Sequence, residues 1–372
     1  MIHPARKLPF DDLIAGLEAA RAAGNVGRRD GTDGRSLYVY TNRCVYDNGW
    51  DDFSLLARGL IVHLGEKRLL ATPFPKFFNA GERGGTIPDL PFEVFEKVDG
   101  SLGILHHFEG SWRASTKGAF GTPQAAWMES RLADHDLSAL VPGDTYLVEA
   151  VYPENRIVVR YDRAELVLLA GYREDGSEFS FEALRDIADC MGLRAAKRYP
   201  IASFSDLVEH TGLLPATEEG FVIRFSDGLR LKLKGAEYRR IHALISGCTP
   251  LALWEAMAAG DDLEAIRRDL PEEFWDDFDQ INALLASQVT AIKDKVARTA
   301  EAFKDLSDKD VGLKLRTLDP QVQPLIFHWR KSGGKLEDRP LAALHRLVRP
   351  DGNVLPGYTP SHAVNRVAEE DA

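Results

Sequence analysis

The spacing of apolar residues changes once along this chain, and that change constrains the fold more than any other feature. Before about residue 245, short segments alternate apolar and polar side chains between turn residues, which is typical of strands with one buried face. We therefore predict an α+β part with mostly antiparallel strands over residues 1–245 and an all-α part over residues 246–372. In the second part, apolar residues at helical spacing mark one long helix: Phe274, Phe278, Ile281, Leu285, Val289, Ile292, Val296 and Phe303.

The same patterns predict the individual elements. Helices are expected over residues 11–23, 123–134, 181–191, 250–259, 263–269 and 340–348. Strands are expected over residues 36–41, 58–64, 68–72, 112–118, 145–152, 156–159, 166–170, 218–225 and 229–234. Residues 28–35 are expected to form a polar loop, and the tail after Pro350 is expected to be poorly ordered.

The composition is that of a soluble globular protein. Of the 372 residues, 44% are hydrophobic and 28% are charged, and no apolar run approaches the roughly 20 residues that cross a bilayer. The N-terminus lacks the apolar core of a signal peptide, and the three cysteines are far apart, so we expect a cytoplasmic protein with reduced thiols. A net charge of −11 counts against non-specific coating of nucleic acid but permits a local basic groove.

One short stretch, Phe95-Glu96-Lys97-Val98-Asp99-Gly100-Ser101, has the residues of a nucleophilic lysine in a turn between two strands. A nucleophilic lysine must lose its proton near pH 7 although its free pKa is about 10.4, and burial or neighbouring cations can lower that pKa. The glycine would let the backbone approach a nucleotide closely. The alternative is an ordinary hairpin turn, because Lys-x-Asp-Gly arises by chance in roughly one chain in ten of this length.

The chain also has the other groups that transfer of a nucleotide to a lysine requires. Cations must offset the charge of a triphosphate, carboxylates must hold a divalent metal, and an apolar wall must face the base. Lys232 and Lys234 would share one face of a strand, although that face could equally be an ordinary solvated one. Glu149 and Glu219 lie in apolar strands, where an unpaired acid is costly unless it is partly exposed. The remaining candidate cations are Arg58, Lys76 and Lys117.

In combination and in this order, these motifs resemble the covalent nucleotidyltransferase superfamily of ATP-dependent ligases and capping enzymes. Lys97-x-Asp99-Gly100 is similar to its nucleophile motif, Glu219-Gly220 to its Glu-Gly motif and Lys232-x-Lys234 to its paired-lysine motif. Within the superfamily the chain most resembles the tRNA-repair RNA ligases of the phage T4 RNA ligase 1 type over about residues 55–240. The further markers are Ala57-Arg58-Gly59, Lys76-Phe77-Phe78-Asn79, Ser115-Thr116-Lys117-Gly118, Asn155-Arg156-Ile157-Val158 and Tyr238.

The resemblance implies a role for each matching residue. Lys97 would become attached to AMP, Glu149 would hold the ribose, and Glu219 would position Mg²⁺ or Mn²⁺. Phe78 and Tyr238 would shape the nucleotide pocket. The motif residues Glu96, Asp99, Gly100 and Gly220 would lie at the bound ATP. The groups expected to contact ATP phosphates or the RNA 5′-phosphate are Arg58, Lys76, Lys117, Lys232 and Lys234.

The implied activity is ATP-dependent joining of RNA 5′-phosphate and 3′-hydroxyl ends, with broken tRNA or another broken RNA as the partner. The chain has no phosphate-binding loop of a kinase, so end-healing would require a separate kinase and phosphatase. Two alternatives stay open, namely a DNA ligase or capping guanylyltransferase, and an inactive RNA-binding module of the same fold. No oligonucleotide-binding barrel is recognisable after the paired lysines, which argues against the first alternative.

The helical part has basic residues beside His328 and Trp329. Basic and aromatic groups together suit contacts with phosphates and unstacked bases, so we expect this part to bind RNA. The alternative is a solvated surface around the Gly333-Gly334 turn. The basic residues are Arg330, Lys331, Lys335, Arg339, Arg346 and Arg349.

Overall fold

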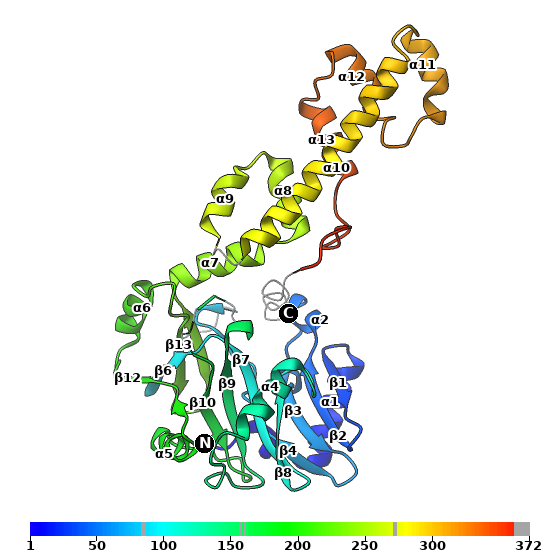
Figure 1. Cartoon of the computed structure of the whole chain (residues 1–372). Helices are drawn as coiled ribbons and strands as arrows, with labels where there is room; N and C mark the ends of the chain where they lie inside the picture. The colour runs from blue at the N-terminus through cyan, green and yellow to red at the C-terminus, as the bar shows by residue number, and fades with distance from the viewer. Residues whose placement is uncertain (83–86, 156–157, 160, 162, 271–273, 361–372) are drawn as a thin grey trace. The chain divides into compact units, whose positions relative to one another are not determined.

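The computed structural model describes residues 1–82, 87–155, 158–159, 161, 163–270 and 274–360 (Figure 1). The chain divides into two compact units, Met1–Arg240 and Ile241–Glu369. The first unit is built on three β-sheets, and the described residues of the second unit form helices and turns. The predicted α+β class, with mostly antiparallel sheets followed by a helical part, is confirmed.

The first sheet has the antiparallel order β1-β2-β3-β4. Leu13 and Leu17 on α1 pack against Tyr38 and Leu60 of this sheet, and all four are fully buried. The predicted hairpin around Gly65 is confirmed as β3 and β4. The elements of this region are η1 (Pro4–Arg6), α1 (Phe10–Ala22), β1 (Val26–Asp30), β2 (Arg35–Tyr40), α2 (Asn42–Tyr46), α3 (Asp52–Leu56), β3 (Arg58–His63) and β4 (Arg68–Ala71).

The other two sheets have the orders β11-β10-β9-β7-β8 and β12-β6-β13-β14-β5. Their strands are β5 (Phe78–Asn79), β6 (Phe92–Lys97), β7 (Ser101–Phe108), β8 (Ser111–Thr116), β9 (Thr145–Val151), β10 (Glu165–Tyr172), β11 (Arg194–Ala195), β12 (Arg198–Tyr199), β13 (Gly220–Phe225) and β14 (Arg230–Lys234). Only the short edge pairs β10/β11 and β14/β5 are parallel among the described strands. The helices of this region are α4 (Pro123–Leu132), η3 (Pro153–Asn155), α5 (Phe181–Met191) and α6 (Phe204–Gly212).

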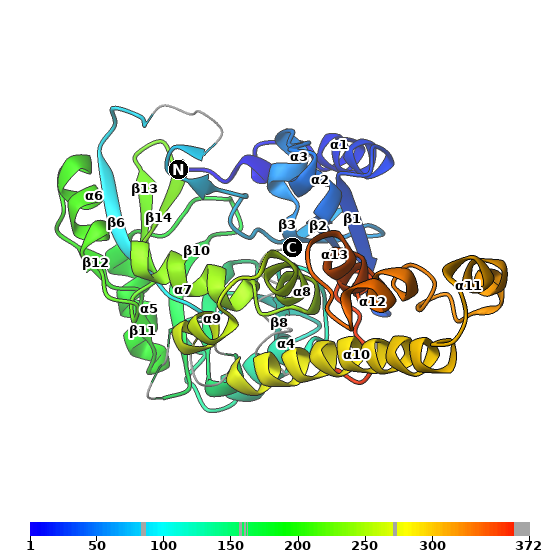
Figure 2. The ribbon, with the colours of Figure 1, turned by 90° about the horizontal axis from the view of Figure 1, so that it is seen from above.

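The second unit is organised on α10 (Trp275–Ala302), which confirms the long helix that the apolar spacing predicts. Its buried stripe includes Phe278, Ile281 and Val296, and α8, α12 and α13 pack on it (Figure 2). No helix of the described residues is long and apolar enough to cross a membrane. The other helices, of which α7 spans the unit boundary, are α7 (Ala236–Ser246), α8 (Pro250–Ala259), α9 (Leu263–Asp269), α11 (Asp308–Lys314), η5 (Leu315–Thr317), α12 (Ile326–Ser332) and α13 (Asp338–Leu347).

Three local predictions are wrong in part. Of the loop predicted over residues 28–35, residues 28–30 belong to the edge strand β1, because β2 offers them an antiparallel partner. Of the tail predicted to be poorly ordered, residues 361–372 lie outside the described residues, whereas the preceding part is held by contacts, since Leu355 is buried and the Tyr358 hydroxyl donates to Asp277 at 2.8 Å. Of the strand predicted over residues 156–159, residues 156 and 157 lie outside the described residues, and residues 158 and 159 belong to no strand.

A buried ion-pair network connects the two larger sheets. Glu178, which follows β10, pairs with Arg224 of β13 at 2.8 Å and with Arg230 of β14. Arg224 also pairs with Glu93 of β6 at 2.5 Å. Burial alone would raise the pKa of Glu178, but the two guanidinium groups outweigh burial and hold its pKa below the ordinary value. The network therefore fixes the strands that carry the candidate site.

We predict that Glu178→Gln lowers the free energy of unfolding by about 3 kcal/mol at neutral pH, because it leaves two buried arginines without their shared anion. The folded-state pKa of Glu178 is depressed, so its contribution is present above the unfolded value of about 4.5 and is lost as pH falls through the folded value. In urea unfolding, the difference in free energy of unfolding between the wild type and Glu178→Gln should therefore be smaller in acid. The exposed Glu182→Gln is the matched control, and an effect of Glu178→Gln within about 0.5 kcal/mol of it would contradict this account.

Candidate active site

The register of three strands brings the motif residues together. Gly220, the first residue of β13, is paired with Lys97 at the end of β6 and with Lys234 at the end of β14. Gly220 has a φ of +146°, and a Cβ atom there would lie 2.0 Å from the carbonyl oxygen of Leu233. Only glycine fits this position, so Glu219 immediately before it is held between the two lysines.

Glu219 is a buried carboxylate shared by two lysines. Its side chain is 1% exposed, and its oxygens lie 2.6 Å from Lys97 Nζ and 3.0 Å from Lys234 Nζ. Burial alone would raise the pKa of Glu219, but Lys97 and then Lys234 outweigh it, so the pKa is lowered. The carboxylate is ionised at neutral pH and holds the Lys97 amine at the end of β6.

The cations beside this pair form a cluster with excess positive charge. One of them, Arg58, has a buried Nη1 atom without a hydrogen-bond partner among the described residues. Such an atom is costly unless a ligand satisfies it, and a polyphosphate would do so. The cation cluster is defined here as Arg58, Lys76, Lys97, Lys117, Lys232 and Lys234.

Lys232 shows the electrostatic effect of this crowding most clearly. Burial is the main cause that lowers its pKa to about 7, and Lys97, Lys234, Lys76 and Arg58 lower it further. No ion pair between Lys232 and a carboxylate is found in the described part of the chain. Lys232 is therefore poised to take up a proton when an anion binds.

Aromatic rings surround the Lys76 amine, which lies 5.1 Å from the Tyr40 ring, 5.2 Å from the Trp50 ring and 5.5 Å from the Phe78 ring. Burial would raise the pKa of Tyr40, but Lys117, Arg58 and Lys76 outweigh it and lower the pKa. The hydroxyl of Tyr40 thus lies in the positive field of the cluster. Sequence reasoning missed Tyr40 and Trp50, and the only sequence signal for Tyr40 is its place at the end of an alternating strand.

The turn after Lys97 joins two different sheets and is not a hairpin turn, since β6 pairs with β12 and β13 whereas β7 pairs with β8 and β9. Asp99 fixes this turn. Its Oδ2 accepts from the backbone N–H groups of Val158 and Val159 at 2.9 and 2.7 Å, and its Oδ1 accepts from the Tyr238 hydroxyl at 2.9 Å. Its own N–H donates to the Tyr161 hydroxyl at 2.9 Å. Tyr238 is fully buried, so its contact positions the turn.

Gly100 brings the turn against β9, where a Cβ atom would lie 2.6 Å from the Ala150 oxygen and 3.0 Å from Glu149 Cγ. Glu149 is thereby held beside the turn, with 9% exposure. Glu96 lies elsewhere, because neighbouring strand residues face opposite sides of a sheet. It accepts from both terminal nitrogens of Arg194, at 2.7 and 3.3 Å, and is not part of the cation cluster.

The described residues contain no group of three or more His, Cys, Asp or Glu side chains placed to hold a metal ion. Mg²⁺ is commonly held by one or two carboxylates together with substrate phosphates. Glu219 fits such a shared arrangement, and a cation there would compete with Lys97 and Lys234 for its oxygens.

A family model described as RNA ligase matches residues 56–238. This match identifies residues 56–238 as a region similar to RNA ligases, here called the ligase region. The match includes Lys97, Glu219 and the paired lysines, whereas Tyr40 and Trp50 lie before it.

The chain is similar to several curated proteins. It is 28% identical over 217 residues to a provisionally named bifunctional polynucleotide kinase/RNA ligase of Autographa californica nuclear polyhedrosis virus, covering 50% of this chain and 30% of that protein. It is 29% identical over 164 residues to RNA ligase 1 of bacteriophage TS2126, covering 38% of this chain and 40% of that protein. The chain thus spans half or less of the length of these relatives.

Among solved structures, an archaeal ATP-dependent RNA ligase aligns over 98% of both chains with 17% identity and a TM-score of 0.49.

The basic residues expected to bind RNA lie outside the ligase region and differ in their surroundings. Arg330 donates to the carbonyl oxygens of Phe303 and Leu306 at 2.5 and 2.7 Å and pairs with Asp308 at 3.2 Å. It therefore holds the connection between α10 and α11. The other five basic residues are exposed, namely Lys331, Lys335, Arg339, Arg346 and Arg349.

We predict that binding of tripolyphosphate is coupled to proton uptake at pH 8. A bound anion favours the charged form of Lys232, whose pKa is about 7, so the amine takes up a proton. Calorimetry in buffers of different ionisation enthalpy should show this uptake, and it should vanish near pH 5.5 because Lys232 is then already protonated.

Lys232→Met should abolish most of the proton uptake. The control Lys117→Met removes the same charge from the cluster and should still show the proton uptake. Equal uptake by the wild type and Lys232→Met would show that another group takes the proton.

Proposed function

We propose that this protein is an ATP-dependent RNA ligase that joins a 5′-phosphate to a 3′-hydroxyl. The observation that carries the proposal is the position of the Lys97 amine, 2.6 Å from a buried carboxylate and within a cluster of cations. The match of residues 56–238 to the family model of RNA ligases supports it. The activity of the whole chain is our inference, since the matches cover only 30% and 40% of the relatives reported above.

The reaction has three transfers. The Lys97 nitrogen attacks the α-phosphorus of ATP, a nitrogen–phosphorus bond forms, and the bond to pyrophosphate breaks. An oxygen of the RNA 5′-phosphate then takes the AMP and releases the lysine. Finally, the RNA 3′-hydroxyl attacks the activated 5′-phosphorus, AMP leaves, and the strand is sealed.

The residues of the chain supply positioning and charge. The cations of the cluster would neutralise the triphosphate as pyrophosphate leaves. Lys97 must lose its proton before attack, while its contact with Glu219 favours the ammonium form. Binding of ATP therefore has to weaken that contact. A divalent metal, Mg²⁺ or Mn²⁺, held by Glu219 and the phosphates would supply charge that competes for the carboxylate. Glu149 beside the turn would meet the ribose.

The substrate that we propose is broken RNA, including broken tRNA, whose ends a separate kinase and phosphatase have prepared. The helical unit would bind the folded part of that RNA. A capping enzyme or an inactive binding module would give a different outcome in the labelling test, whereas a DNA ligase would take the same label and differ in the strand that it joins.

We predict that the protein becomes covalently labelled by ATP labelled at the α-phosphate, stably in acid, and that Lys97→Ala abolishes this labelling. The exposed Lys67→Ala is the matched control and should label like the wild type. Excess chelator should reduce labelling if the metal is required. Labelling by GTP in place of ATP would indicate a capping enzyme, and its absence with both nucleotides would contradict the proposed activity.

We also predict that Tyr238→Phe slows labelling about tenfold or more with little change in thermal stability. The hydroxyl holds Asp99 in the lysine turn, and small misplacements of a nucleophile are costly to rate. Tyr199→Phe removes a hydroxyl from the same unit, where the ring contacts Phe221, and should label normally. Equal single-turnover rates for the two variants would show that the Tyr238 contact is only structural.

A further inference from the structure

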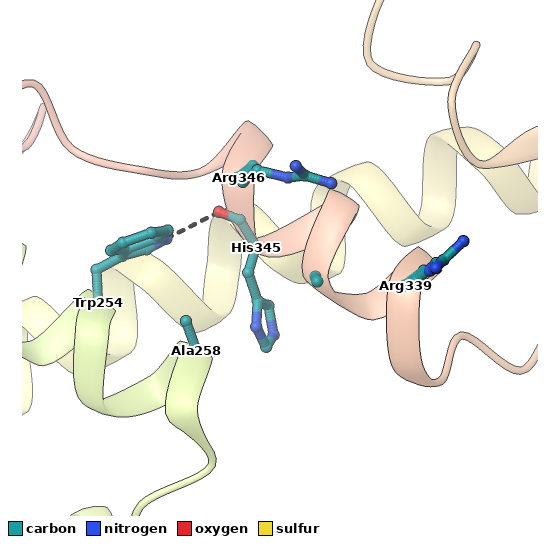
Figure 3. Close-up of a pocket in the computed structure, with 6 residues that line it drawn as sticks. Trp254, Ala258, Arg339, His345 and Arg346 are labelled. Atoms are coloured by element: carbon teal, nitrogen blue, oxygen red, sulfur yellow. Dashed lines mark hydrogen bonds between the residues drawn. The ribbon is translucent and has the colours of Figure 1, made fainter.

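A pocket of about 470 Å³ lies between α8 and α13 in the helical unit (Figure 3). Helical spacing places its residues on the facing sides of two helices, with positions 254 and 258 on α8 and positions 339, 342 and 346 on α13. The volume lies within the range of small-ligand pockets. The lining residues are Trp254, Ala258, Arg339, Ala342, His345 and Arg346.

The charge of this pocket is positive. Its lining includes two arginines and no acid. Both guanidinium groups belong to exposed residues, and neither forms an ion pair within the described ranges of the chain. Arg267 and Arg330 of the same unit, in contrast, are engaged with Asp279 and Asp308. The pocket arginines are therefore available to an anion.

The wall of the pocket is aromatic and rigid. The Trp254 indole N–H donates to the carbonyl oxygen of His345 at 2.8 Å, which fixes the ring between the helices (Figure 3). The guanidinium of Arg349 lies 5.4 Å from the ring centre and adds a further positive group. The small side chains of Ala258 and Ala342 leave space beside the indole.

These features together select one kind of ligand. A simple anion would not require an aromatic wall, and an apolar peptide would not use two unpaired arginines. An unpaired nucleotide uses both, since its base stacks on an aromatic ring and its phosphates meet guanidinium groups.

We propose that this pocket binds one unpaired nucleotide of the RNA substrate, with its base against Trp254 and its flanking phosphates at Arg339 and Arg346. The inference rests on the proposed function, because the ligand is the RNA to be joined. It assigns RNA binding to Arg339 and not to Arg330, whose guanidinium is engaged within the fold.

Full-length protein is titrated into a hairpin RNA that carries 2-aminopurine in a single-stranded overhang, and fluorescence anisotropy is measured at several salt concentrations. We expect Arg339→Glu/Arg346→Glu to weaken binding at least ~10-fold. The slope of log affinity against log salt should fall by about 1.4, because two single-strand phosphate contacts are lost. The control Arg298→Glu/Arg316→Glu makes the same charge change at exposed residues outside the pocket and should bind like the wild type.

Stacking is tested separately with Ala342→Leu, which fills the pocket without a change of charge. Quenching of 2-aminopurine on binding should be lost in this variant and kept in the control. The inference is overturned if the pocket variants bind the hairpin RNA with its overhang as tightly as the control does. It is also overturned if they lose as much affinity for a blunt duplex RNA as for the RNA with the overhang. Labelling of Lys97 by ATP is measured on every variant and should be unchanged. Failure of labelling in the wild type would refute the proposed ligase chemistry, while the binding measurements would still decide whether the pocket holds RNA.

Discussion

The buried carboxylate of Glu219 is the contact on which the site depends. A carboxylate taken out of water is costly unless it is paired, and here two lysines from neighbouring strands share it. The pairing requires β6, β13 and β14 to keep their register and Gly220 to keep its unusual backbone angle. Fold and site are therefore linked, because a slip of one strand by one residue would turn the lysines away from Glu219.

Two lysines of the cation cluster are in different electrostatic surroundings. Lys97 touches Glu219 and lies in a turn that Asp99 fixes, whereas Lys232 is buried among cations and has a pKa of about 7. We infer a division of roles, in which Lys232 responds to the charge of the bound phosphates and Lys97 makes the bond to AMP. A low pKa alone would favour Lys232 as the nucleophile. The fixed position of Lys97 beside Glu219 and Glu149 favours Lys97.

The sequence predicted the strands that carry the site and several helices well, because alternation, helical spacing and turn residues are local signals. The β13–β14 hairpin, α5, α8 and α10 are examples. It did not predict that the lysine turn joins two sheets, since the partners of β6 lie more than 100 residues further along the chain. The same limit explains why Tyr40, Trp50 and Tyr161 were missed. Their roles arise from contacts across sheets and loops, and no spacing within one segment encodes them.

The central claim is that Lys97 is the residue that receives AMP. Tandem mass spectrometry of peptides from protein incubated with ATP and Mg²⁺ tests it most directly, because it identifies the modified side chain. We expect AMP on Lys97 and an unmodified Lys232. AMP on Lys232, the competing amine with the lowered pKa, or on any other lysine in place of Lys97 would contradict the account.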